Sequence, residues 1–319
     1  MDLSIIIPCY NEAQNIPLLF EELRRVVNST GLSYEVIGID DGSQDQTFEG
    51  LKKEISRLPQ GKAVRLRRNF GQTAALSAGF DLAEGEIIIT LDGDLQNDPE
   101  DIPKLVAKIQ QGYDLVSGWR EKRQDPFWSR RLPSSVANRM ISWVTGVKLH
   151  DYGCTLKAFT REVAKNIRLY GEMHRFIPAI ASWMGVTMAE VPVHHRPRKF
   201  GRSKYGLSRT IRVLLDLITV KFLATYSTRP IHVFGYWGIL SGMAGFGLAC
   251  YLTFQRLFLG IPLANRPILL LAILLIFIGV QFISMGLLGE LQVRTYHESQ
   301  GKPIYYIKEA FEYPLPKME

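Results

Sequence analysis

The feature that most constrains the fold is an apolar run at residues 87–91 that ends in Asp92, Gly93 and Asp94. A short, continuously apolar segment is typical of a strand buried on both faces, as in a parallel sheet covered by helices. The two carboxylates would then follow the carboxyl end of that strand, the edge at which open α/β sheets bind ligands. The sequence therefore predicts an α/β fold with a ligand site at this edge.

Strands and helices alternate on both sides of this run. Short apolar segments indicate strands, and apolar residues at helical spacing indicate the helices that follow them. The other expected strands are 3–7, 35–39, 63–66 and 114–117, and the clearest expected helices are 72–83 and 100–111. This alternating series predicts a doubly wound sheet.

Two later segments, 232–257 and 267–291, are nearly uncharged and long enough to cross a hydrocarbon core of about 30 Å. They predict a hairpin of two transmembrane helices, and the basic residues at its outer ends place both chain termini in the cytosol. Patterns at 127–146 and 207–225 have apolar and basic faces, as in helices that lie in a membrane interface. For the first of them, a core helix with a solvated basic face is the alternative.

The expected organisation therefore has four parts. They are a catalytic domain at 1–205, a juxtamembrane amphipathic helix at 206–230, the hairpin at 231–292 and a cytosolic tail at 293–319. An integral protein of the inner or plasma membrane is expected, with its catalytic domain in the cytosol.

Composition narrows the possible partners. The net charge is +7, but no basic stripe with interleaved aromatic residues occurs, so an anionic membrane is a better partner than nucleic acid. The three cysteines, Cys9, Cys154 and Cys250, are too few and too far apart for a disulfide framework or a zinc site. The N-terminus lacks the basic region of a signal peptide. Gly238 and Gly242 have the spacing of a helix-pairing motif, which leaves a homo-oligomer and a chance match as alternatives.

Acidic residues at two strand ends carry the candidate chemistry. Asp92 and Asp94, followed by Gln96, suit Mg²⁺ or Mn²⁺, which prefer oxygen ligands and commonly share them with substrate phosphates. Solvated turn carboxylates are the alternative. Asp40 and Asp41 end another parallel strand and should open on the same crevice, where a carboxylate can accept a hydrogen bond from a ribose or a base.

Five motifs give the chain a family resemblance. They are Ile-Ile-Pro-Cys-Tyr-Asn-Glu at 6–12, Asp-Asp-Gly-Ser-Gln-Asp-Gln-Thr at 40–47, Arg-Asn-Phe-Gly at 68–71, Asp-Gly-Asp-Leu-Gln at 92–96 and Gly-Arg-Ser-Lys at 201–204. Together they resemble the family 2 glycosyltransferases with a GT-A (Rossmann-like) fold. Within that family, the chain is similar to the polyprenyl-phosphate glycosyltransferases, which include dolichol-phosphate mannose synthases and GtrB-type bactoprenol glucosyltransferases.

The resemblance implies a role for each matching position. Nucleotide-sugar contacts are implied for Pro8, Tyr10, Glu12, Asp40, Asp41, Asp92 and Gly93, and metal and diphosphate contacts for Asp92, Asp94 and Gln96. A loop that closes over the donor is implied at Arg198, Arg202 and Lys204, with solvated surface charge as the alternative. The acceptor phosphate would meet Arg120, Arg130 or Arg131. Asp151 would orient the acceptor or take a proton from it, unless it is only a turn residue.

The implied reaction is metal-dependent, inverting transfer of a hexose to undecaprenyl or another polyprenyl phosphate at the cytosolic membrane face. Glucose from UDP-glucose is the expected donor, and mannose, galactose and N-acetylglucosamine are alternatives. Two other classes of function stay open at this point: a processive polysaccharide synthase and a non-enzymatic partner of a flippase.

Overall fold

A computed structural model describes residues 1–121, 138–139, 141–142, 145–169, 171, 173–197 and 303–314, with isolated residues between 277 and 295. The chain divides into two compact units, one of Met1–Val220 with Pro303–Glu319 and one of Lys221–Lys302. The sheet and the candidate site belong to the first unit.

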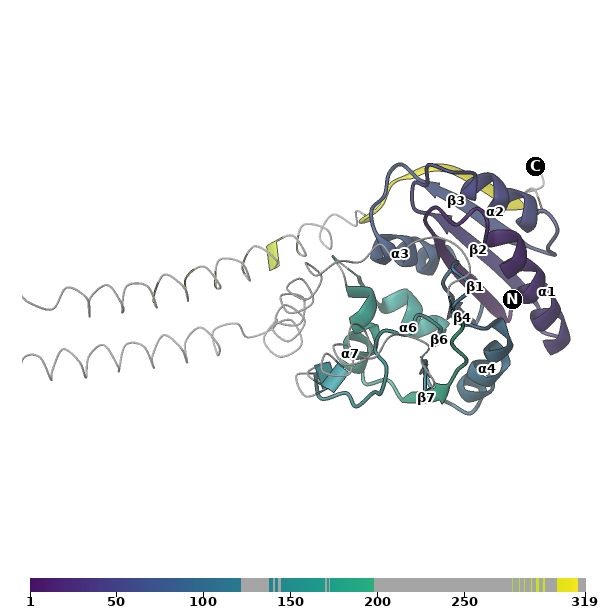
Figure 1. The fold of residues 1–319 in the computed structure, drawn as a ribbon. Helices are drawn as coiled ribbons and strands as arrows, with labels where there is room; N and C mark the ends of the chain where they lie inside the picture. The colour runs from purple at the N-terminus through teal and green to yellow at the C-terminus, as the bar shows by residue number, and fades with distance from the viewer. Residues whose placement is uncertain are drawn as a thin grey trace, which may run out of the picture. The chain divides into compact units, whose positions relative to one another are not determined.

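An eight-stranded mixed sheet forms the centre of the first unit, with the strand order β7-β5-β6-β4-β1-β2-β3-β8 (Figure 1). The strands are β1 Leu3–Cys9, β2 Tyr34–Asp40, β3 Gly61–Leu66, β4 Ile87–Thr90, β5 Leu115–Trp119, β6 Lys157–Thr160, β7 Met188–Pro192 and β8 Ile307–Tyr313. Strands β1 to β4 are parallel, whereas β6 and β8 run antiparallel to their neighbours. Strands β5 and β7 are parallel to each other.

Helices cover both faces of the sheet. They are α1 Ile16–Thr30, α2 Thr47–Ile55, α3 Gln72–Leu82, η1 Pro99–Asp101, α4 Ile102–Gln110, α6 Arg161–Asn166, η3 Met173–Phe176 and α7 Ile177–Ser182. Helices α1, α2 and α4 share one buried cluster with the sheet, which includes Leu19, Phe48 and Leu105. Helix α3 packs on the other face, where a Cβ atom on Gly79 would lie 2.2 Å from Ile6 Cγ2. In Figure 1, α1 and α2 lie on one side of β1 and β2 and α3 on the other.

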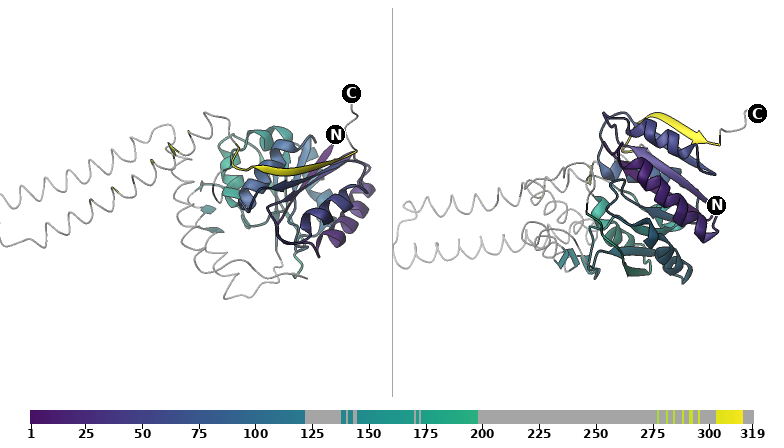
Figure 2. Two further views of the ribbon diagram at one scale, coloured as in Figure 1. Left: turned by 90° about the horizontal axis from the view of Figure 1, so that it is seen from above. Right: turned by 45° about the vertical axis from the view of Figure 1, so that its right-hand side comes forward.

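The predicted strands at the amino-terminal part of the chain are confirmed as β1 to β5, and the predicted helices at 72–83 and 100–111 correspond to α3 and α4. The doubly wound sheet needs a correction, because the antiparallel strand β6 lies between β4 and β5. The tail adds a strand that sequence reasoning did not predict: β8 pairs with β3 and lies at the end of the sheet (Figure 2). Most residues of β8 are exposed, so the tail lacks the apolar pattern of a buried strand.

The membrane predictions fall mostly outside the described residues. This applies to the span at 232–257, the helix at 206–230 and most of the span at 267–291. Among the residues that the structure describes, no helix is both long and apolar enough to cross a bilayer. Of the helix predicted at 127–146, the described residues 138–139, 141–142 and 145 are helical, and Ile141 is buried. Contact of these segments with a membrane stays a prediction.

Candidate active site

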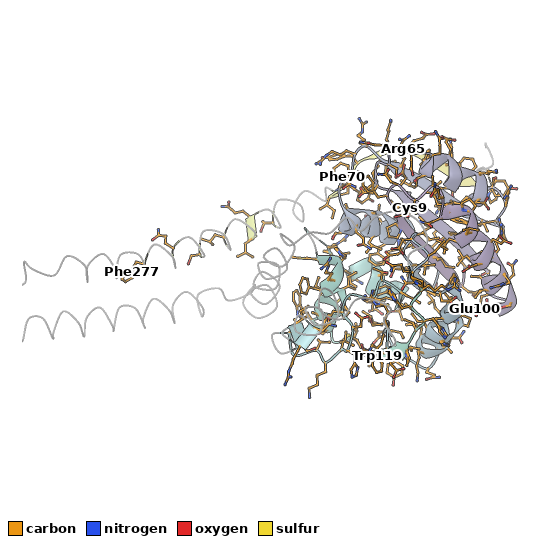
Figure 3. The ribbon with its side chains drawn as sticks, viewed as in Figure 1. Cys9, Arg65, Phe70, Glu100, Trp119 and Phe277 are labelled. Atoms are coloured by element: carbon orange, nitrogen blue, oxygen red, sulfur yellow. The ribbon has the colours of Figure 1, made fainter. Side chains whose placement is uncertain are left out.

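The carboxyl ends of several strands meet at one edge of the sheet. Cys9 at the end of β1 is paired with Asp40 at the end of β2. Thr90 of β4 and Ser117 of β5 both pair with Lys157 of β6, so Asp92 and Arg120 follow the same row of the sheet. Figure 3 labels three residues at this edge: Cys9 at the end of β1, Phe70 after β3 and Trp119 at the end of β5.

Hydrogen bonds fix the orientation of the Asp92 carboxylate. Gln72 Nε2 donates to Asp92 Oδ1 at 2.8 Å, and Thr155 Oγ1 donates to Asp92 Oδ2 at 2.7 Å. Asn97 Nδ2 in turn donates to Thr155 Oγ1 at 2.9 Å. A carboxylate oxygen can accept more than one hydrogen bond or ligand, so both oxygens keep coordination capacity.

Asp92 and Asp94 fit a divalent cation by their charge and burial. Burial, and after it the nearby negative charge of Asp94, raise the pKa of Asp92 to about 7. Asp94 is also buried, and its Oδ1 accepts from the backbone N–H of Gln96 at 3.1 Å. A divalent cation between these oxygens would relieve their repulsion.

The metal would need ligands beyond this pair. Within the described part of the chain, no group of three or more His, Cys, Asp or Glu side chains is arranged to hold an ion. Mg²⁺ usually keeps waters and takes one or two carboxylates plus substrate phosphates, so a two-carboxylate site suits an ion that arrives with a diphosphate. The predicted third contact, Gln96, has its amide nitrogen 3.5 Å from His195 Nε2.

Local geometry keeps this turn close to β1. A Cβ atom on Gly93 would lie 2.8 Å from Cys9 Sγ, so glycine permits the close approach of the two segments. Leu95 has a positive φ of 61°, a conformation that non-glycine residues adopt at a cost of about 1–2 kcal/mol. Asn11, in the loop after β1, also has a positive φ of 54°. Such strain is typical of functional loops, and both residues lie at the edge that carries the acidic motifs.

Asp40 and Asp41 take different positions at the end of β2. Asp40 is fully buried; its Oδ1 accepts from Ser43 N at 2.9 Å, whereas its Oδ2 has no hydrogen-bond donor among the described residues. Arg65 Nε lies 3.4 Å from that oxygen without making a hydrogen bond. Asp40 Oδ2 is therefore a buried acceptor that forms an ion pair with Arg65 but receives no hydrogen bond from the described residues. This position suits the predicted nucleotide contact.

Asp41 instead holds the loop that precedes α3. Its carboxylate accepts the backbone N–H groups of Phe70 at 2.7 Å and Gly71 at 2.9 Å. Burial raises the pKa of Asp41 to about 6, although these two donors lower it. Since Gln72 follows directly and contacts Asp92, this carboxylate supports the candidate metal site from a distance.

The remaining predicted residues of the first loop surround the end of β1. Pro8 is paired with Ile39 in the sheet, and Tyr10 is half-buried. The backbone N–H of Glu12 donates to Thr47 Oγ1 at 2.9 Å, and Glu12 Oε2 accepts from Asn15 at 2.6 Å. The loop is thus anchored to the start of α2. Its nucleotide contacts stay a prediction.

Arg120 and Asp151 form a buried ion pair. Arg120 Nε lies 2.6 Å from Asp151 Oδ2, and Arg120 Nη2 lies 3.0 Å from Asp151 Oδ1. Burial lowers the pKa of Arg120, but the hydrogen bonds and charge of Asp151 raise it above its ordinary value. No described residue accepts a hydrogen bond from Arg120 Nη1, which leaves that nitrogen for an anion. The sequence analysis gave both residues acceptor-side roles but did not predict this ion pair. The two short contacts with Arg120 suit a supporting role for Asp151 better than proton transfer.

Other predicted residues lie outside the described residues: Arg130, Arg131, Arg198, Arg202 and Lys204. Conversely, sequence reasoning missed Gln72, Thr155 and Glu190, each of which contacts a predicted site residue or its loop. In the sequence, Gln72 stands out only because it follows the motif at 68–71, and Thr155 only because it lies four residues after Asp151. Their residue types give no signal, because single amides and hydroxyls are common in turns.

The fold and the acidic edge of the sheet define the GT-A class of α/β proteins. The sequence model of the Glycosyl transferase family 2 matches residues 4–168, which is more than half of the chain. The chain therefore belongs to this family and is a glycosyltransferase. The mixed α/β sheet is accordingly the sheet of a GT-A fold.

A curated relative and two solved structures extend the comparison. The chain is 43% identical to the dodecaprenyl-phosphate galacturonate synthase of Rhizobium johnstonii, over 98% of this chain and 94% of the relative. Glucosyl-3-phosphoglycerate synthase from Mycobacterium tuberculosis, solved with Mn²⁺, UDP and phosphoglyceric acid, gives a TM-score of 0.53 at 18% identity, over 70% of this chain and 78% of that one. A further mycobacterial protein gives a TM-score of 0.52 at 20% identity, over 70% and 74%. At these identities the two structures show a shared fold.

Proposed function

We propose that this enzyme transfers a sugar from a UDP-sugar to a polyprenyl phosphate. The observation that carries the proposal is the 43% identity, over nearly the whole of both chains, to a relative whose name states that it makes dodecaprenyl-phosphate galacturonate. The five motifs of the chain support the same reaction class.

The site geometry suits both substrates. Asp40 Oδ2 is a buried acceptor for a donor group of the nucleotide, and Asp92 with Asp94 would hold a divalent cation against the diphosphate. Arg120 Nη1 would bind the acceptor phosphate. The M. tuberculosis synthase that shares the fold was solved with Mn²⁺ and UDP, which supports Mn²⁺ or Mg²⁺ as the ion here.

The reaction follows from the charge of the acceptor. A lipid phosphate is anionic at neutral pH, so one of its oxygens attacks the anomeric carbon without first losing a proton. The new phosphate ester bond forms as the bond from that carbon to the nucleoside diphosphate breaks, and in-line attack inverts the anomeric configuration. The cation, when bound, stabilises the charge of the departing diphosphate. Arg120 contributes alignment and relief of repulsion between two anions.

Two donors are compared in this proposal. UDP-glucose is the donor predicted from the sequence, whereas the name of the relative favours a galacturonate donor. Galacturonate differs from glucose by a carboxylate in place of the hydroxymethyl group and by the configuration at C4, so a cationic or strongly donating group near that carboxylate would favour galacturonate.

The acceptor makes a membrane location part of the proposal. Residues 232–257 and 267–291 would form the transmembrane hairpin, with the catalytic domain and both termini in the cytosol. The segments at 127–146 and 206–230 would lie in the interface, so that the site faces a phosphate at the lipid surface.

The test is a product assay with the purified full chain, Mn²⁺ and undecaprenyl phosphate. UDP-glucose, UDP-galacturonate, UDP-galactose, UDP-N-acetylglucosamine and GDP-mannose are offered separately, and lipid products are identified by mass spectrometry. One sugar per lipid is expected from one donor. The variant Asp94→Asn should lose most of this activity, whereas Glu86→Gln, at the opposite end of β4, should keep it. Polymer as the product, or full activity of Asp94→Asn, would contradict the proposal.

A further inference from the structure

Glu190 of β7 holds the loop that carries Asp151. Its Oε1 accepts the backbone N–H of His150 at 2.9 Å and that of Asp151 at 3.3 Å. Its Oε2 lies 3.0 Å from the same His150 nitrogen and 2.8 Å from His150 Nδ1. One carboxylate therefore binds two successive peptide groups, and the Glu190 side chain is only 13% exposed.

The two residues held by Glu190 contact the last residue of β5, Trp119, and the residue that follows it, Arg120. The His150 ring stacks on Trp119, with centroids 4.4 Å apart and planes inclined by 21°. Asp151 binds Arg120 through two nitrogens, at 2.6 and 3.0 Å. The loop is thus joined to the end of β5 by two contacts, one aromatic stack and one ion pair.

Neighbouring backbone geometry leaves the guanidinium little freedom. A Cβ atom on Gly153 would lie 3.2 Å from Arg120 Nη2, so glycine leaves the space that the guanidinium occupies. Gly153 N donates to Asp151 Oδ1 at 3.1 Å, and Glu190 itself is fixed opposite Ser117 by the pairing of β7 with β5. The guanidinium orientation is therefore determined by a chain of contacts that begins on β7.

We propose that Glu190 is a positioning residue for the acceptor phosphate: it fixes the loop at 150–151, so that Asp151 directs Arg120 Nη1 toward the anion. This inference rests on the proposed function, because Arg120 is assigned to the acceptor there. Glu190 touches neither substrate in this scheme. Loss of its carboxylate lets the loop move, and a displacement of Arg120 weakens binding of the lipid phosphate more than binding of the nucleotide sugar.

The test compares Glu190→Ala and Glu190→Gln with the matched control Glu86→Gln. Glutamine keeps the volume and one acceptor oxygen, so it covers the case in which the alanine variant fails to fold. Glu86 is exposed and pairs with Arg161 at the far end of β4. Steady-state kinetics with undecaprenyl phosphate should show an acceptor KM about tenfold higher for Glu190→Ala, with a smaller rise for Glu190→Gln and an unchanged donor KM.

A second readout needs no substrate. Phenylglyoxal modifies accessible arginines, and Arg120 is 15% exposed while it is held by Asp151. Mass spectrometry of the Arg120 peptide should show modification at least about fivefold faster in Glu190→Ala than in the wild type, because the loop opens locally. The rate should be unchanged in Glu86→Gln.

The outcomes separate the two proposals. Faster modification with a selective rise in acceptor KM supports the positioning role. An unchanged modification rate in both Glu190 variants, or equal rises of donor and acceptor KM, would overturn it. If the wild type moves no sugar to the lipid, the proposed function fails, and the modification rate alone still decides whether Glu190 holds Arg120.

Discussion

Replacing Asp151 by asparagine should be one of the most destabilising polar substitutions in the catalytic domain. Its carboxylate makes two short contacts with Arg120, at 2.6 and 3.0 Å, and the two side chains are only 4% and 15% exposed. Asparagine can accept from one guanidinium nitrogen, but its own NH₂ group would face the other. Arg120 would then keep a buried charge without its directly bonded counterion, which costs about 3–5 kcal/mol.

The assay is denaturant unfolding of the purified full chain, followed by far-UV circular dichroism. The control is Glu86→Gln, which breaks an ion pair of similar length to Arg161 in which the side chains are 69% and 42% exposed. Exposed pairs contribute about 0–1 kcal/mol, so this control should unfold close to the wild type.

A double variant tests the cause of the effect. Arg120→Leu with Asp151→Leu removes both charges, and it should recover most of the stability that either single substitution loses. The reasoning is refuted if Asp151→Asn unfolds within about 1 kcal/mol of the wild type, since a buried pair cannot behave like an exposed one. It is also refuted if the double variant is as unstable as the two single variants combined.

Three further predictions follow from burial and close packing. Asp41→Asn should become more stable relative to the wild type as the pH rises from 4 to 7. The pKa of Asp41 is about 6 in the folded protein against 3.8 in the unfolded chain, so ionisation of Asp41 destabilises the wild type by about 3 kcal/mol at high pH and has no effect below the unfolded pKa. A difference in urea unfolding that does not change with pH would contradict this prediction. Gly79→Ala should destabilise the protein by about 1–2 kcal/mol, because its Cβ would lie too close to Ile6. Gly50→Ala should stabilise α2, because its Cβ would have no contact closer than 3.7 Å. The two variants should therefore shift the melting temperature in opposite directions. Thr155→Val should weaken Mn²⁺ binding about tenfold, measured by electron paramagnetic resonance, and Thr155→Ser should restore it; equal binding by all three proteins would count against this support of Asp92.

The part of the fold that sequence predicts well is the part whose strands are buried on both faces. Strands β1, β2 and β4 contain continuous apolar runs, and each ends at a motif with a polar residue, so both their type and their carboxyl ends can be recognised. The strands that sequence reasoning missed have a weaker signal. Strand β6 has four residues, β7 is mostly half-buried, and β8 is mostly exposed and belongs to the tail. Their pairing depends on partners distant in the sequence.

The site shows the same division. Asp92, Asp94 and Asp40 were predictable because carboxylates at the ends of parallel strands must share an edge of the sheet. The contacts that orient them come from residues with no chemical signature of their own. Gln72 and Thr155 reach Asp92 from segments 20 and 63 positions away, and Glu190 reaches Asp151 from 39 positions away. A single sequence contains no pattern that records such pairs.

Strand β6 gives a physical reason for the separation of donor and acceptor groups. In a doubly wound sheet β5 would lie beside β4, and Arg120 would approach Asp92 and Asp94 directly. The antiparallel strand inserts one more position between them, while Thr155, just before β6, bonds to Asp92. In the proposed reaction, the site at Arg120 for the attacking phosphate and the site at Asp92 and Asp94 for the departing diphosphate would therefore follow strands that are separated by β6. This separation suits an in-line displacement, because the sugar would be held between the two phosphates and each phosphate would have its own counterion.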